Sequence, residues 1–412
     1  MFKFRLAHLG LALAATALVA AAPLAGFAPA RAAAQGRENV RAEVAKPVLE
    51  AQKLALAGKS REALAKLREA DGVAGKSAAE TYQIERLRAS AAAAAGDNEA
   101  AIHAFESVLN SGRLPAADVP KFTQALAGMY YRAKDWPKAI TWINRSLKDA
   151  DTPQMRELLL QSYYLSGNYA AAAKQLQAET AGHGASESQL QMLANIAHKQ
   201  NDKAAYIATL EKLAANHPKP SYWADLLSRV STKPGFSDRL ALDVARLKLV
   251  HGLVSKPADY MEIAQLALLA GNPAEAVHVV EQGYKSGALG NGNNVARHQR
   301  LKDLAARDLA DSVKNAAATE AELVRNKEAD KLAALGFALV SQGNAAHGLA
   351  LMNQALRMGG LKYPEEARLH LGIAYANAGK KPEALAALKA VQGKDGSADL
   401  ARYWILQLNR AA

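Results

Sequence analysis

A short phrase of residues recurs along this chain and limits what it can fold into. The phrase is a glycine, an alanine five positions later and an apolar residue four positions after that alanine. When variants that begin at Lys134, Gln200 and Gly343 are counted, it returns every 33 to 38 residues, with two gaps of about twice that length. A chain with an internal period of this size folds as a stack of similar units. The full copies are Gly58-Ala63-Leu67, Gly96-Ala101-Phe105, Gly167-Ala172-Leu176, Gly271-Ala276-Val280 and Gly379-Ala384-Leu388.

Each unit is expected to be a pair of antiparallel helices. Past residue 40 the sequence is rich in alanine, apolar residues recur at helical spacing, and no stretch alternates in the manner of a strand. Glycine can take the positive φ that ends a helix, and a small alanine lets the next helix pack closely. Because one helix pair cannot bury its apolar side alone, neighbouring pairs must stack. The sequence therefore predicts an all-α fold, a right-handed α-solenoid of about ten antiparallel helix hairpins.

The units resemble the tetratricopeptide repeat (TPR), whose pattern is Trp-x2-Leu-Gly-x2-Tyr, then Ala-x3-Phe, then Pro. The best match is the run from Leu371 to Tyr375, followed by Ala384 and Leu388. Leu126 with Tyr130, and Leu159 with Tyr163, hold the same places in two earlier units. The resemblance extends over residues 45–410, although the opening aromatic is usually missing and residues 285–328 match poorly.

The N-terminus is typical of an export signal. Lys3 and Arg5 precede an apolar stretch, and small residues with a proline follow it. This pattern predicts a signal peptide over residues 1–34, cleaved after Ala30 or after Ala34, with a retained membrane anchor as the alternative. We therefore expect a periplasmic protein. Residues 222–223 and 233–239 are also similar to exported repeat proteins of Gram-negative bacteria.

Two interruptions of the repeat suggest internal boundaries. Residues 231–238 have the composition of a turn, and residues 283–294 form the largest loop signal, with glycines at 287, 290 and 292. We expect an N-terminal helical array over residues 35–230, helical repeats with the glycine- and asparagine-rich loop over 231–294, and a C-terminal array over 295–412. A helix at 395–410 would cap the last hairpin.

The residues argue against catalysis. The chain has no cysteine, which excludes disulfides, thiol nucleophiles and thiolate metal sites. Its ten histidines include no pair at metal-ligand spacing, the Gly-Lys-Ser sequences lack the leading glycine of a phosphate loop, and no Gly-x-Ser-x-Gly motif occurs. We expect no catalytic residue, no metal site and no cofactor. A carboxylate pair distant in the sequence is the one remaining route to a hydrolase.

The resemblance to TPR proteins implies a binding function. In that family the first helices of successive pairs line a concave groove that receives a peptide or a partner protein. The implied function is an exported scaffold or adaptor that binds a protein or peptide partner within a cell-envelope complex. The corresponding groove positions are Gln124, Tyr131 and Arg132 in one unit, with Glu157, Gln161 and Tyr164 in the next.

A second hypothesis comes from the charge. The net charge is +12, too diffuse along the chain to indicate nucleic-acid binding. Basic residues nevertheless gather in two regions, where they would form either a solvated helix face or a stripe that contacts a membrane surface or glycan. The alternative function is a periplasmic carrier or sensor of an anionic envelope lipid or glycan. The residues of this predicted basic stripe are Arg239, Arg246, Lys248, Arg297 and Arg300.

Overall fold

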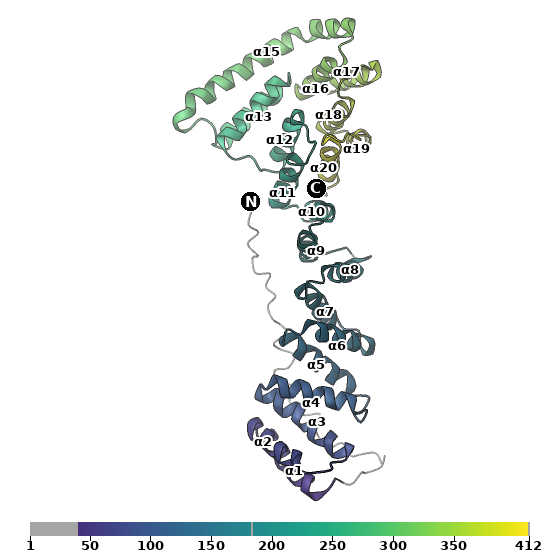
Figure 1. Cartoon of the computed structure of the whole chain (residues 1–412). Coiled ribbons are helices and arrows are strands. Elements are labelled where there is room, and N and C mark those ends of the chain that lie inside the picture. The colour runs from purple at the N-terminus through teal and green to yellow at the C-terminus, as the bar shows by residue number, and fades with distance from the viewer. Residues whose placement is uncertain (1–39, 183, 411–412) are drawn as a thin grey trace. The chain divides into compact units, whose positions relative to one another are not determined.

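The computed structural model describes residues 40–182 and 184–410, so the predicted signal peptide and both cleavage positions lie outside the described residues. Over the described ranges the secondary structure is helical, without a strand, and most helices pair with the next along the chain (Figure 1). The predicted all-α fold of TPR-like hairpins is thereby confirmed. The chain divides into two compact units, Met1–Ala181 and Gly182–Ala412.

The division does not fall at the boundaries that the interruptions suggested. The unit boundary after Ala181 lies inside the array expected over residues 35–230. Residues 231–238 and 283–294 both lie within the second unit. The first of these segments is a packing point, because the amide of Ser237 donates a hydrogen bond to the carbonyl of Asp395 at 2.9 Å.

The first unit contains successive helix pairs, and the second helix of each pair also contacts the first helix of the next. One apolar cluster runs through it from Val44 to Leu159. The pairs are α1 (Ala42–Leu56) with α2 (Ser60–Asp71), α3 (Ala78–Ala95) with α4 (Asn98–Asn110), α5 (Val119–Arg132) with α6 (Trp136–Asp149), and α7 (Pro153–Leu165) with α8 (Tyr169–Thr180).

The recurrent phrase forms the turn of each hairpin. Gly96 ends α3 with φ of 77°, and its amide bonds back to the carbonyls of Ala92 and Ala93. Lys134 takes the same left-handed conformation between α5 and α6, with φ of 61°. In the full copies, and after Lys134, the alanine five residues after the turn is completely buried, as Ala101 and Ala139 show. The phrase thus encodes a left-handed turn and the close packing of the helix after it.

The second unit has the same pairs with two departures, a long helix α15 and a terminal helix α20. Its elements are α9 (Glu187–Lys199), α10 (Lys203–Asn216), α11 (Pro220–Ser231), η2 (Asp238–Leu240), α12 (Ala241–Val250), α13 (Pro257–Leu269), α14 (Pro273–Lys285), η3 (Gly292–Asn294), α15 (Val295–Asn326), α16 (Ala329–Ser341), α17 (Ala345–Met358), α18 (Pro364–Asn377), α19 (Lys381–Lys389) and α20 (Ser397–Asn409).

Helix α15 replaces a hairpin with one straight segment of 32 residues. The gap between Gly271 and Gly343 spans two periods, so a hairpin turn would be expected near residue 307. No glycine occurs from residue 293 to residue 335, and the helix continues through that point until Lys327 ends it in a left-handed conformation. A continuous helix explains why residues 285–328 match the TPR pattern poorly.

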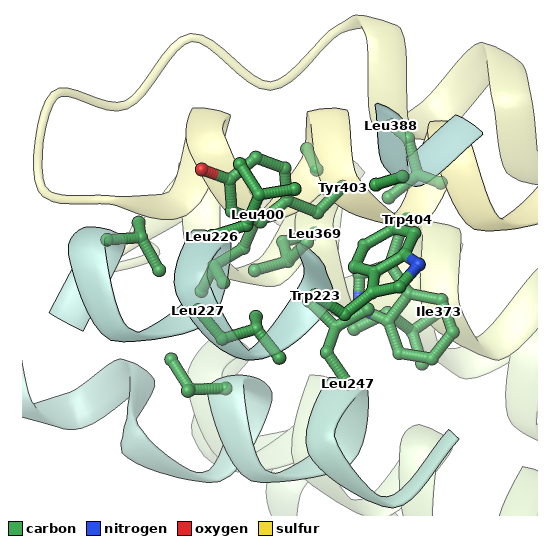
Figure 2. Packing of buried hydrophobic residues seen from close by; sticks show 14 of the residues in the cluster. Trp223, Leu226, Leu227, Leu247, Leu369, Ile373, Leu388, Leu400, Tyr403 and Trp404 are labelled. Carbon is green, nitrogen blue, oxygen red and sulfur yellow. The ribbon is translucent and has the colours of Figure 1, made fainter. Parts of the chain in front are cut away.

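The second unit closes on itself. Helix α20 packs against α10 and α12 as well as α18 and α19, so it does more than cap the last hairpin. Trp223 of α11, Leu369 of α18 and Tyr403 of α20 share one core cluster (Figure 2). Ion pairs cross the same closure, including Lys233 with Asp399 at 2.7 Å. The interior of this unit is therefore filled by its own C-terminal helices.

Candidate interaction faces

Three of the predicted groove residues form one chain of hydrogen bonds between successive hairpins. Tyr131, in the last turn of α5, donates its hydroxyl proton to Oε1 of Gln161 on α7 at 2.7 Å. Gln161 in turn donates from Nε2 to Oε1 of Glu157 at 2.7 Å. Gln161 and Glu157 are four positions apart and so share one side of α7. The side of α5 and α7 that carries this chain is called here the first-helix face.

The chain has one exposed end and one half-buried end. Glu157 is exposed, whereas Tyr131 and Gln161 are half-buried. Burial raises the pKa of the Tyr131 hydroxyl, and the negative charge of Glu157 raises it further. The phenol therefore stays protonated and remains a donor to Gln161 throughout the physiological pH range.

An aromatic pair accompanies the turn in both of these hairpins. The ring of Tyr131 meets Trp136 edge to face with 5.4 Å between centroids. Tyr164 meets Tyr169 in the same way at 5.6 Å. The two pairs are one repeat apart, at residues 131 and 136 and at residues 164 and 169. Sequence analysis missed Trp136 and Tyr169, although an aromatic five residues after each groove tyrosine was the available signal.

The remaining groove candidates lie apart from this chain. Gln124 is half-buried on α5 and Arg132 is exposed at its end. Within the described ranges, no hydrogen bond joins either side chain to Tyr131, Gln161 or Glu157. The structure thus brings together three of the six predicted positions and places Tyr164 in the neighbouring aromatic pair.

The predicted basic stripe is wrong as a single surface. Arg246 is only 7% exposed and lies between Asp243 and Glu275, at 2.7 Å from a carboxylate oxygen of each. Arg239 pairs with Glu366 at 3.1 Å and covers the ring of Tyr363. Arg239, Lys248, Arg297 and Arg300 are exposed, but Arg239 is held in ion pairs with Glu366 and Asp395. Apart from Asp243, which is three residues before Arg246, these partners were not predictable because they come from residues up to 156 positions away.

The buried ions around Arg246 connect several helices of the second unit. Asp243 of α12 accepts from Arg246 and lies 3.1 Å from Nε2 of His370 on α18. Burial alone would raise the pKa of Asp243, but His370 and Arg246 outweigh it and lower the pKa to about 2. Asn272, which caps α14, donates to Ser341 of α16 at 2.9 Å. These contacts are structural, since they lie within and between the packed helices of the second unit.

Features that would indicate a metal site or a membrane span do not occur in the described residues. Residues 40–182 and 184–410 contain no cluster of three or more His, Asp or Glu side chains placed to hold a metal ion. Among the helices of the same ranges, none combines the length and apolar character needed to cross a membrane.

Comparisons with known proteins found similarity in solved structures. No protein-family model matches the sequence, and no curated protein matches it. The TPR2AB domain of yeast Sti1, solved as a pHSP90 complex, is 16% identical, with 64% of this chain and 98% of that chain covered and a TM-score of 0.30. The TPR domain of P58(IPK) is 15% identical, with 89% and 97% covered and a TM-score of 0.22.

A third similar structure, Naa15/Naa10 bound to HypK-THB, is 14% identical, with 87% of this chain and 58% of that chain covered and a TM-score of 0.31. Because all these TM-scores are low, the assignment of the fold rests on the helix pairs and the period of this chain. Left-handed turns at the recurrent glycines and buried alanines after them repeat along both units. The chain is an α-solenoid protein built of TPR-like helix pairs.

Proposed function

We propose that the protein is a non-catalytic scaffold that binds a peptide or partner protein along the first-helix face of the first unit. The observation that carries this proposal is the hydrogen-bonded chain of Tyr131, Gln161 and Glu157. A surface whose side chains are already held in place loses less conformational entropy on binding. The adjoining aromatic pairs add large, rigid contact area of the kind that anchors interfaces.

The chemistry of this face favours a partner that donates hydrogen bonds. Glu157 accepts one bond through Oε1, which leaves Oε2 and further lone pairs for a ligand. The rings of Tyr131 and Tyr164 offer aromatic surface beside these acceptors. Backbone amides or the side chains of lysine and arginine in an extended segment or a helix would match them.

The proposal includes the compartment. The charged, apolar and small-residue segments at the N-terminus support export to the periplasm and a role in a cell-envelope complex. The lipid or glycan carrier has less support, because Arg246 is buried in ion pairs and the exposed Arg239 is paired with Glu366 and Asp395.

A hydrolase on this scaffold also has little support. A hollow of about 160 Å³ has Glu365, Glu366 and Asp395 in its lining. Glu366 and Asp395 hold Arg239, and Glu365 accepts from the amide of Gln392 at 2.6 Å. These carboxylates are therefore occupied by structural contacts.

Co-purification after cross-linking in the native host tests the proposed face. The wild-type protein should recover one protein at both low and high salt, and Tyr131→Ala combined with Glu157→Lys should lose it. The control is Glu69→Lys on α2, which makes the same charge change at an exposed ion pair of small energetic value. Recovery of only lipid or glycan, lost at high salt, would contradict the proposal, as would equal loss in the control.

A further inference from the structure

Helix α15 carries an apolar stripe that faces solvent. Its inward side is buried near both ends, through Leu301 and Ala305 at one end and Leu323 at the other. Another side of the helix exposes apolar residues from Ala306 to Ala317 that are spaced by four and three positions, the spacing of a coiled-coil seam. Glu320, which contacts His347 at 2.7 Å, takes the next seam position before Val324. Val313, near the middle, is 58% exposed. The residues of this α15 stripe are Ala306, Ala310, Val313, Ala317 and Val324.

The origin of the stripe is the missing turn. Elsewhere in the array, a stretch of sequence of this length forms two helices that pack against each other as a hairpin. Here the two halves that would have formed a hairpin run straight on as one helix. The ends of α15 pack on α13, α14 and α16, while the stripe residues between them are exposed. The middle of the helix thus offers a side that a further helix can cover.

A row of positive charge borders the stripe. Arg300, Arg307 and Lys314 are spaced seven residues apart, and all three are exposed. Arg307 directly follows Ala306 of the stripe, and Lys314 directly follows Val313. In coiled coils the residues that flank the seam form ion pairs with the other helix and so select the partner. A row of one sign therefore selects a helix whose facing edge is negative.

We propose that the α15 stripe docks an amphipathic helix of a partner protein, with acidic side chains along the edge that faces Arg300, Arg307 and Lys314. Three alanines in the stripe allow the helix axes to approach closely, which brings the flanking charges within ion-pair distance. This is a second docking surface, in the second unit, and it does not depend on the first-helix face.

The same residues argue against a second copy of this chain. In an antiparallel pair, each flanking row faces its own equivalent, so Arg307 and Lys314 would meet another positive row. In a parallel pair, Lys302 would face Arg307 of the other copy, which is again a repulsion between like charges. The stripe therefore fits a helix of different sequence better than it fits itself.

A lipid surface is also a poorer occupant. Helices that lie in a membrane interface bury bulky residues such as tryptophan, phenylalanine and leucine. The α15 stripe consists of alanine and valine, and acidic side chains at Asp303 and Asp311 on the same helix would repel anionic headgroups. The geometry points to a protein helix.

The test uses a defined probe and the purified full-length protein. The probe is a labelled 21-residue peptide of three heptads, with alanine and leucine at the seam and glutamate at both flanking positions. A control peptide has the same sequence with lysine in place of glutamate at those flanking positions. Fluorescence anisotropy should show saturable binding of the glutamate peptide, binding that weakens with added salt, and at least about tenfold weaker binding of the lysine peptide.

Two variants locate the binding. Arg307→Glu with Lys314→Glu should weaken binding of the glutamate peptide at least about tenfold, and Val313→Asp should do the same. The matched control is Arg297→Glu with Lys285→Glu, which makes an equal charge change at exposed positions off the stripe and should leave the affinity within about twofold. Circular dichroism melts establish that each variant is folded.

Several outcomes would overturn the proposal. Failure of the glutamate peptide to bind at submillimolar concentration is one, and equal binding of both peptides is another. Equal loss in the control variant would assign the effect to net charge alone. A dimer in sedimentation that Val313→Asp dissociates would make the occupant a second copy. Co-sedimentation with phosphatidylglycerol vesicles, lost in Arg307→Glu with Lys314→Glu, would make it a lipid surface.

Discussion

At the scale of single residues, the second unit depends on charges placed inside it. Arg246 holds two carboxylates, Asp243 and Glu275, and its guanidinium also lies over the ring of Phe337 at 4.7 Å. Burial lowers the pKa of Arg246, but the two carboxylates outweigh burial and raise it. Removing one member of such a group leaves the others buried without their counter-charge, which costs more than the group contributes as a whole.

We therefore expect Arg246→Met to lower the unfolding free energy of the second unit by about 3 to 5 kcal/mol. Adding Asp243→Asn and Glu275→Gln to that variant should recover part of the loss, since no buried charge is then left unpaired. Urea unfolding of the three proteins measures both changes. A triple variant less stable than Arg246→Met would show that the ions themselves stabilise the fold.

His251 gives the second unit a stability that depends on pH. Its ring stacks on Trp223 with 3.6 Å between centroids, and burial, with the nearby charge of Arg410, lowers its pKa to about 4. Unfolded His251 takes up a proton below pH 6.5, whereas folded His251 stays neutral until about pH 4. This contribution is complete above pH 6.5 and is lost as the pH falls toward 4.

Between pH 7.5 and pH 5 the unfolding free energy should fall by about 2 kcal/mol through His251. His251→Phe keeps the stacked ring and removes the titration, so its stability should be flatter over the same range. Denaturant unfolding followed by tryptophan fluorescence at each pH makes the comparison. An equal fall in both proteins would place the pH dependence elsewhere.

At the scale of elements, the hairpin turn is what the sequence predicts best. A hairpin turn needs a residue in the left-handed conformation at the end of the first helix and a small residue in the second. Both requirements concern residues close together in the chain, so the sequence shows them as a short recurrent pattern. Lys134, Asn201 and Lys327 are the exceptions, because they adopt without being glycine the positive φ that glycine takes in the other turns. Lys134 tests this account most simply, since it stands in the turn between α5 and α6.

Replacing Lys134 with glycine should raise the unfolding free energy of the first unit by about 0.5 to 1 kcal/mol, because the left-handed strain is released. The same substitution at Lys138, inside α6, should lower it by about 1 kcal/mol. Thermal unfolding of the two variants beside the wild type checks both signs. Destabilisation by Lys134→Gly would mean that the turn does not need the left-handed conformation.

Features that join distant residues were not predictable in the same way. Glu275, Glu366 and Asp395 come from other elements than the arginines that they pair with, so the gathering of basic residues alone suggested a surface stripe. Tyr131 and Gln161 were identified because both belong to helices placed one period apart. The straight course of α15 left only a negative signal, the lack of glycine where a turn was due.

At the scale of the whole molecule, the two units differ in how much polar and aromatic surface remains available for a partner. The second unit fills its interior with α20, which packs on α10, α12 and α18. Trp404 of α20 is 6% exposed and belongs to the cluster that contains Trp223. The first unit is a simple succession of pairs, and its first-helix face keeps polar and aromatic groups available.

Closure of the second unit by α20 makes Trp404 a test of its independence. Trp404→Ala should cost the second unit about 3 to 5 kcal/mol, because it removes a large buried ring, and should leave unfolding of the first unit unchanged. Hydrogen exchange of peptides from each unit separates the two. Equal deprotection of both units would show that they unfold as one.

The most direct test of the scaffold function is photo-cross-linking in the native host from position 131. A photoreactive phenylalanine analogue at Tyr131 should capture one protein, and the same analogue at Lys174, exposed on α8, should not. Capture of one protein from position 131 alone is the predicted result. Capture of only lipid or glycan, or of the same set of proteins from both positions, would contradict the account.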